Sequence, residues 1–132
     1  MMSLHNEIDM SELYNANKEQ RQLLSRLIKS LQKLNRQEAK AEHDYRLAYT
    51  KTVMKMNTYG FEGELDGKNY ATDSIAWTAA IRIAKGVPDV AEKRERRDLI
   101  KGEKEAVMQK IYQTKLEIGS LEKEIEAINR AD

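Results

Sequence analysis

Apolar residues recur at alternating intervals of four and three residues near the C-terminus. This spacing holds one stripe of side chains toward a partner helix, as in a coiled coil. The stripe, here the C-terminal seam, consists of Val107, Ile111, Thr114, Ile118, Leu121, Ile125 and Ile128. A shorter leucine seam of the same kind consists of Leu24, Leu27, Leu31 and Leu34. The two seams predict two long helices that pack together as an antiparallel hairpin.

Helix-breaking residues set the boundaries of the first half of the chain. We expect residues 1–10 to be a frayed leader and Ser11 to cap a long helix over residues 11–58, because no glycine or proline interrupts it. Three glycines follow within residues 59–72, which predicts a turn-rich excursion. Its Asp66-Gly67 dipeptide is compatible with a short hairpin and equally with a plain loop.

The second half begins with a short helix over residues 73–86 that is apolar on most sides, so we expect it to be buried or to lie in an oligomer interface. Gly86 suits its C-terminal end and Pro88 the first turn of a long helix over residues 88–130. Within that helix, Gly102 marks a kink or a point of close packing. The predicted fold is all-α and a single domain over residues 1–132: an elongated antiparallel hairpin with the short helix and the glycine-rich excursion at its head.

Composition fits this picture. Charged residues make up 34% of the 132 residues and aromatic residues 6%, which is typical of long helices with one buried stripe. There is no cysteine, which excludes disulfides, thiol catalysis and cysteine-ligated zinc. No apolar run reaches the roughly 18 residues of a membrane span, and the N-terminus lacks the order of a signal peptide. We therefore expect a soluble protein of the cytoplasm.

The first long helix carries the main candidate for binding. Residues 18–40 contain seven bases and two acids, whereas residues 106–132 contain four bases and five acids. Five of these bases lie two residues, or about 200°, away from the leucine seam and so face outward. We call them the basic stripe: Arg26, Lys29, Lys33, Arg36 and Lys40. A row of this kind can follow a phosphate backbone, although it is also typical of a solvated face or of contact with an acidic subunit.

A second group of candidates lies around the middle of the chain. It combines aromatic and basic residues that could form a pocket at the head: Tyr45, Tyr49, Trp77, Arg82, Arg94 and Arg97. The aromatic rings could stack on bases, but at helical spacing beside alanines they are more typical of a core. The run over residues 93–97 looks basic, yet residues 87–105 hold six bases and six acids, which favours internal ion pairs.

Catalytic and metal-binding patterns are missing from the sequence. The side chains of Glu42, His43 and Asp44 diverge on a helix and cannot close on one metal, and His5 is the only other histidine. Asp66-Gly67-Lys68 lacks the rest of a phosphate loop. No triad or paired-carboxylate setting is recognisable, so we expect no enzyme activity and no cofactor.

Four short segments resemble a known group of proteins. They are residues 41–48 (Ala-Glu-His-Asp-Tyr-Arg-Leu-Ala), residues 83–86 (Ile-Ala-Lys-Gly), Val90-Ala91 and Arg97-Asp98. Over roughly residues 35–130 the chain is similar to small helical proteins encoded among the replication and recombination genes of phages of Gram-positive bacteria. The resemblance implies a phage or prophage setting, a nonenzymatic accessory role and proximity to DNA metabolism.

Two functions of different kinds follow as hypotheses. In the first, the chain is an oligomeric accessory protein that binds DNA, RNA or a replication or recombination protein. In the second, it is a phage inhibitor that grips a host defence or regulatory factor, or sequesters an anionic small molecule at its head. A purely structural spacer would self-associate and do nothing else. All three readings include a homo-oligomer, because exposed apolar stripes usually find a partner.

Overall fold

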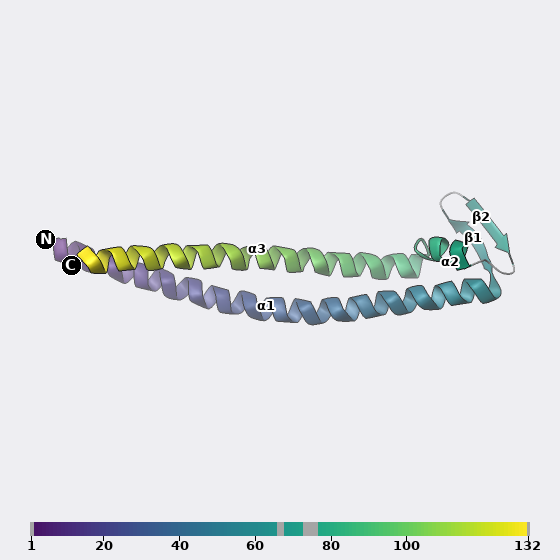
Figure 1. The fold of residues 1–132 in the computed structure, drawn as a ribbon, viewed down its shortest axis with the longest axis horizontal. Helices are drawn as coiled ribbons and strands as arrows, with labels where there is room; N and C mark the ends of the chain where they lie inside the picture. Colours follow the sequence, from purple (N-terminus) through teal and green to yellow (C-terminus); the bar gives the residue numbers. More distant parts are fainter. Residues whose placement is uncertain (1, 66–67, 73–76, 132) are drawn as a thin grey trace. The chain divides into compact units, whose positions relative to one another are not determined.

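The computed structural model describes the backbone of residues 2–65, 68–72 and 77–131, and the side chains of residues 10–60 and 77–131. Its elements are, in chain order, α1 (Met2–Tyr59), β1 (Phe61–Leu65), β2 (Lys68–Thr72), α2 (Trp77–Ala84) and α3 (Pro88–Ala131) (Figure 1). The predicted helical hairpin is confirmed, and the described chain adds two five-residue strands to it.

The chain divides into two compact units. The first unit contains residues 1–34 and 103–132, and the second contains residues 35–102. Each of the helices α1 and α3 contributes one segment to the first unit and another segment to the second unit. Each unit is therefore described separately.

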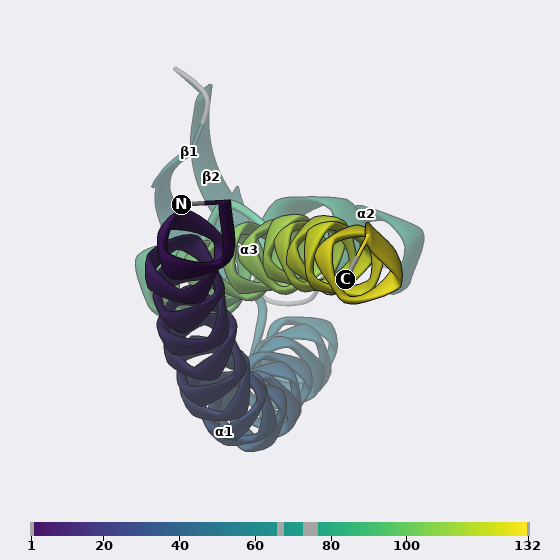
Figure 2. The same cartoon turned by 90° about the vertical axis from the view of Figure 1, so that its left-hand side faces the viewer.

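The first unit is a pair of antiparallel helical segments, one from each end of the chain (Figures 1 and 2). Its buried residues come from the two predicted seams: Leu34, Thr114, Ile118, Leu121 and Ile125. Removal of these apolar side chains from water is the main force that holds such segments together, at about 25 cal/mol per Å². An ion pair between Arg21 and Glu122 joins the same two segments.

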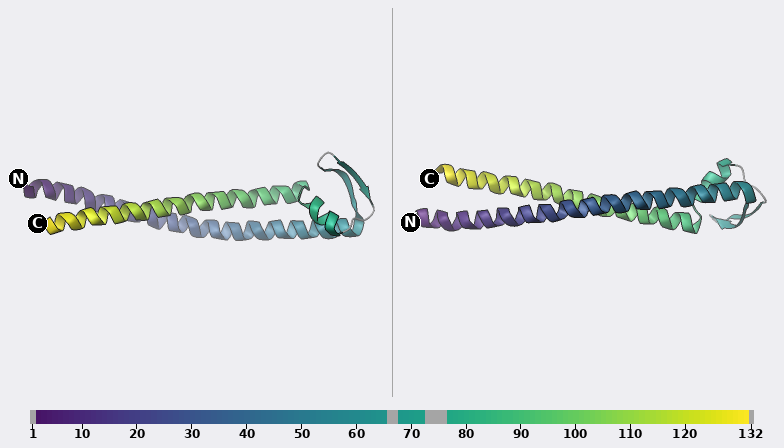
Figure 3. Two further views of the ribbon diagram at one scale, coloured as in Figure 1. Left: turned by 45° about the horizontal axis from the view of Figure 1, so that its top comes forward. Right: turned by 90° about the horizontal axis from the view of Figure 1, so that it is seen from below.

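The second unit packs α2 against the C-terminal part of α1 (Figure 3). The cluster of buried residues contains Val53 and Met56 from α1 and Ala80, Ile83 and Ala84 from α2. The small alanines allow the two helix backbones to approach closely. Val90, at the start of α3, is fully buried in the same unit.

Several helix boundaries differ from the predictions. The helix α1 begins at Met2, so the described residues 2–10 belong to it and do not form a frayed leader. The N-terminal segment contains no glycine or proline, and nothing in it opposes continuation of the helix. At its other end α1 includes Tyr59, and Gly60 follows with a φ of 81° and donates its N–H to the Met56 carbonyl at 2.8 Å. This left-handed conformation favours glycine and ends the helix.

Residues 61–65 and 68–72 form paired strands, which favours the hairpin of the two alternatives. The strands β1 and β2 are antiparallel, and their register pairs Phe61 with Thr72 and Leu65 with Lys68. Asp66 and Gly67, predicted as the turn, lie outside the described residues.

The short helix is shorter than predicted, and within the single chain only one of its faces is buried. The described part of the predicted residues 73–86 is helical only over Trp77–Ala84, and residues 73–76 lie outside the description. One face is buried, while Trp77 is 52% exposed and Ile81 is 44% exposed. The chain then turns through 3₁₀-type bonds from the Gly86 and Val87 N–H groups to the Ile83 and Ala84 carbonyls.

The start of α3 is confirmed at Pro88, and its end lies at Ala131 rather than residue 130. Proline suits this first helical position because it lacks the N–H that would have no partner there. Gly102 is exposed, and a Cβ added to it would meet nothing within 4 Å. The close-packing interpretation of Gly102 is therefore wrong.

Candidate functional site

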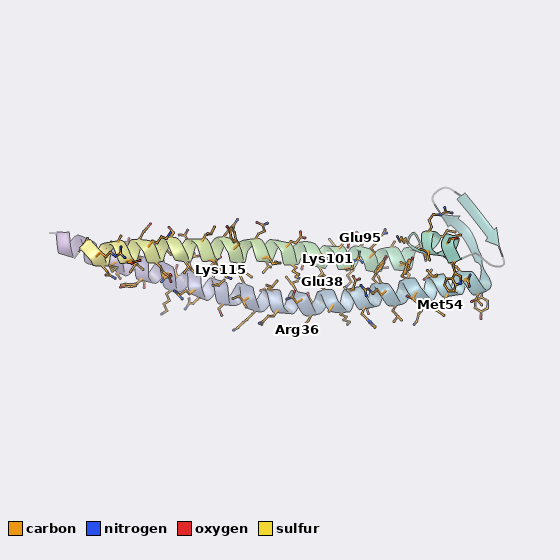
Figure 4. All side chains as sticks on the ribbon, viewed as in Figure 1. Arg36, Glu38, Met54, Glu95, Lys101 and Lys115 are labelled. Atoms are coloured by element: carbon orange, nitrogen blue, oxygen red, sulfur yellow. The ribbon has the colours of Figure 1, made fainter. Side chains whose placement is uncertain are left out.

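The five residues of the basic stripe are all exposed on α1. Arg26, Lys29 and Lys33 belong to the first unit, and Arg36 and Lys40 belong to the second. Figure 4 shows Arg36 on the outer side of α1, whereas Glu38 lies on the side that faces α3 within the second unit. The helical spacing thus presents the bases to solvent, as the sequence predicts.

Among the described residues, those of the stripe also lack acidic partners, which some other bases of the chain have. Arg21 pairs with Glu122, Arg46 with Glu42 at 2.9 Å, and Lys93 with Asp89 at 2.6 Å. Within the part of the chain that the structure describes, none of the five stripe residues forms an ion pair. Their charges are therefore available to an anionic partner.

A different arrangement surrounds Arg97, one of the six residues proposed for a head pocket. Its guanidinium carbon lies 4.5 Å from the centroid of the Tyr45 ring. It donates to Glu42 at 3.3 Å and to Asp98 at 3.0 and 3.1 Å. With 17% of the side chain exposed, the guanidinium is partly removed from water and held by two carboxylates and an aromatic face.

These contacts shift the protonation of both partners. Burial acts to lower the pKa of Arg97, but the hydrogen bonds and charges of Asp98 and Glu42 outweigh it and raise this pKa. The pKa of Glu42 is lowered, chiefly by the hydrogen bond from Arg46, against the opposing effect of burial and with help from the charge of Arg97. Both groups are thus fixed in their charged forms at neutral pH.

Two tyrosines among the proposed pocket residues, Tyr45 and Tyr49, contact residues of other helices. The Tyr45 and Tyr49 rings lie 6.1 Å apart, centroid to centroid, with a tilt of 30°. The Tyr49 hydroxyl donates to the Ile81 carbonyl of α2 at 3.2 Å, and the ring packs against the buried cluster. Tyr45 contacts α3 through Arg97, so the pair joins α1 to both neighbouring helices of the second unit.

The remaining three members of the group are placed differently. Trp77 and Arg82 are exposed on α2. Arg94 is half-buried and lines a shallow hollow on α3 together with Ala91, Glu95, Asp98 and Leu99. The structure thus brings Tyr45, Tyr49 and Arg97 together as a packed network, and of the six only Arg94 lines this hollow.

Sequence reasoning missed the role of Glu42, which we considered only as a metal ligand. Its spacing of four residues from Arg46 was a readable signal of an ion pair. Its bond to Arg97 joins residues 55 positions apart, and nothing in the local sequence indicates it. The internal ion pairs expected for residues 93–97 are confirmed for Lys93 and Arg97.

Metal-binding groups and membrane-spanning helices are both absent from the described residues. Among the described residues, no group of three or more His, Cys, Asp or Glu side chains could hold a metal ion. None of the helices over the described ranges is long and apolar enough to cross a membrane. Comparison of the chain with known protein families, with curated proteins and with solved structures finds no match.

Proposed function

We propose that this chain is a nonenzymatic accessory protein of a phage or prophage, which oligomerises in the host cytoplasm and binds nucleic acid or a replication or recombination protein. The observation that carries the proposal is the basic stripe. All five of its residues are exposed, and in the described chain none is neutralised by an acid. The phage setting rests on the resemblance of residues 41–48, 83–86, 90–91 and 97–98.

Nucleic acid is the partner that the stripe fits best. From Arg26 to Lys40 the helix rises by about 20 Å at 1.5 Å per residue, and phosphates repeat along one DNA strand at about 3.4 Å. The stripe thus spans several phosphates. It contains no aromatic residue, so we expect binding through the backbone with little preference for sequence.

The proposal includes a coiled coil as the scaffold. Every residue of the leucine seam and of the C-terminal seam is buried or half-buried, although their neighbours on the outer faces are exposed. The seam residues therefore pack between the helices, whereas the outer face of α1 is exposed and can bind a partner.

Fluorescence anisotropy with labelled single- and double-stranded DNA tests the proposal. We expect binding at low salt that weakens as salt increases. A variant with Arg26, Lys29, Lys33 and Arg36 all changed to alanine should lose most of this affinity. A control variant that loses the same charge from exposed sites elsewhere, with Lys51, Lys101, Lys110 and Lys115 changed to alanine, should keep more of it. Equal binding by the two variants would remove the stripe as the cause.

A second candidate function is that of an inhibitor directed at a host factor. It is favoured by the outer face of α2, where Trp77 and Ile81 are 52% and 44% exposed beside the exposed Arg82. An exposed tryptophan next to an arginine is typical of the centre of a protein interface. Affinity purification from host cells tests it: a protein or small molecule retained by the natural chain should be lost with Trp77→Ala and kept with Tyr59→Ala, since Tyr59 is 75% exposed in the same unit.

A further inference from the structure

The outer side of α3 in the first unit is unusually poor in charge. On the side opposite the C-terminal seam, seven positions between Glu105 and Lys123 are uncharged, in a chain that is 34% charged. The exposed Lys110, Lys115, Glu117 and Glu122 lie on the flanks of this side. The uncharged positions are Ala106, Gln109, Tyr112, Gln113, Leu116, Gly119 and Ser120. A helix face that is exposed only to water normally carries charged residues at such positions.

Large apolar side chains stand exposed on this surface. Tyr112 is 63% exposed, Leu116 is 57% exposed and Met108 is 50% exposed. A shallow hollow lined by Glu105, Met108, Gln109 and Tyr112 lies beside them. A Cβ added to Gly119 would meet nothing within 4 Å, so the surface is open there to an approaching backbone.

The spacing of these residues repeats the spacing of the C-terminal seam. Each lies two residues before a seam position and therefore on roughly the opposite side of the helix. The intervals are again four, three, four, three and four. We call this row the outer seam: Glu105, Gln109, Tyr112, Leu116, Gly119 and Lys123.

The outer seam is complementary to itself when reversed. In an antiparallel helix pair related by a two-fold axis, each residue faces a residue of the second copy, and the two residue numbers add up to the same value at every level of the contact. Such a pairing places Glu105 opposite Lys123 of the second copy, Tyr112 opposite Leu116, and Gln109 opposite Gly119. Acid then meets base at both ends, and aromatic meets aliphatic in the centre. In the described chain, neither Glu105 nor Lys123 has an ion-pair partner of its own.

We propose that the outer seam of α3 binds the outer seam of a second copy of this chain in antiparallel orientation. This inference deepens the oligomeric part of the proposed function, because it names the surface and the register of the contact. The paired row extends over about 27 Å. The basic stripe lies on α1 and contributes nothing to this contact.

Sedimentation equilibrium of the full chain tests the surface. The double variant Tyr112→Ser/Leu116→Ser should dissociate roughly a hundredfold more readily than the natural protein, since both central layers are lost. The control Leu47→Ser/Met54→Ser removes two apolar side chains of similar exposure from the second unit and should assemble as the natural protein does. Circular dichroism establishes that each variant is helical. Unchanged assembly of the Tyr112/Leu116 variant would overturn the proposal.

Charge exchange tests the register without removing apolar surface. Glu105→Lys alone and Lys123→Glu alone should each weaken association on the order of tenfold, because both symmetric pairs become repulsive. The two changes in one chain, or an equal mixture of the two single variants, should restore it. Absence of rescue would overturn the antiparallel register. A monomeric natural protein would overturn this inference and the oligomeric claim together, while the anisotropy titration judges the basic stripe separately.

Discussion

The Arg97 guanidinium lies over the ring of Tyr45, with its central carbon 4.5 Å from the ring centroid. The same group bonds to Glu42 at 3.3 Å, one turn earlier on α1. Two neighbouring residues of α1 therefore hold one cation of α3. This relationship links the helices of the second unit through a partly desolvated charge.

Loss of Arg97 should destabilise the protein. Arg97→Ala removes the charge-assisted bond to Glu42, which keeps only Arg46, and removes the cation from the Tyr45 ring, so we expect the free energy of unfolding to fall by about 2 kcal/mol. Arg96→Ala removes an exposed neighbouring arginine and should change it by less than about 0.5 kcal/mol. Urea unfolding followed by circular dichroism measures both, and equal losses would contradict a special role for Arg97.

The lowered pKa of Glu42 predicts an acid-dependent contribution to stability. A carboxylate with a lowered pKa in the folded state contributes fully above its unfolded pKa, about 4.3 for glutamate, and loses the contribution as the pH falls further. The natural protein and Glu42→Gln should therefore differ most in free energy of unfolding at neutral pH. The difference should shrink below about pH 4.3. A gap between their urea midpoints that widens toward acid pH would refute the assignment.

Thr114 is a polar residue in the C-terminal seam, and only 4% of it is exposed. Its hydroxyl donates to the Lys110 carbonyl of the same helix at 2.7 Å, so it makes no bond across the pair. Thr114→Val keeps the side-chain shape and removes a buried polar group. We expect the free energy of unfolding to rise by about 0.5–1 kcal/mol. Thr50→Val at an exposed site is the control, and a clear loss of stability in Thr114→Val would show that the hydroxyl has a further partner.

The sequence predicted those features of the fold that depend on local residues. Periodic apolar positions indicated the long helices, the glycines within residues 59–72 and Pro88 indicated an end and a start, and Asp66-Gly67 allowed the hairpin. The extent of α1 toward Met2 was underestimated, because a frayed end was assumed where no helix breaker occurs. The length of the short helix was overestimated, and the prediction that it is buried or lies in an oligomer interface holds within one chain for one of its faces.

Contacts between distant residues could be predicted least. The spacing of the basic stripe predicted its exposure correctly, because direction on a helix follows from residue number alone. The bond between Arg97 and Glu42 depends on how segments of α1 and α3 align, and charge counts could say only that residues 93–97 would find acids. The six proposed pocket residues do not form one site, because their meeting also depends on how the helices align. Tyr45 and Arg97 met across helices, whereas Trp77 faces solvent.

The salt dependence of DNA binding tests the central claim most directly. Each phosphate contact contributes about 0.9 to the slope of log affinity against log salt for double-stranded DNA. The change of Arg26, Lys29, Lys33 and Arg36 to alanine should therefore reduce the slope by roughly 3 to 4, and the matched Lys51, Lys101, Lys110 and Lys115 variant should leave it nearly unchanged. No measurable binding by the natural protein at low salt, or equal slopes for all three proteins, would contradict a nucleic-acid-binding stripe on α1.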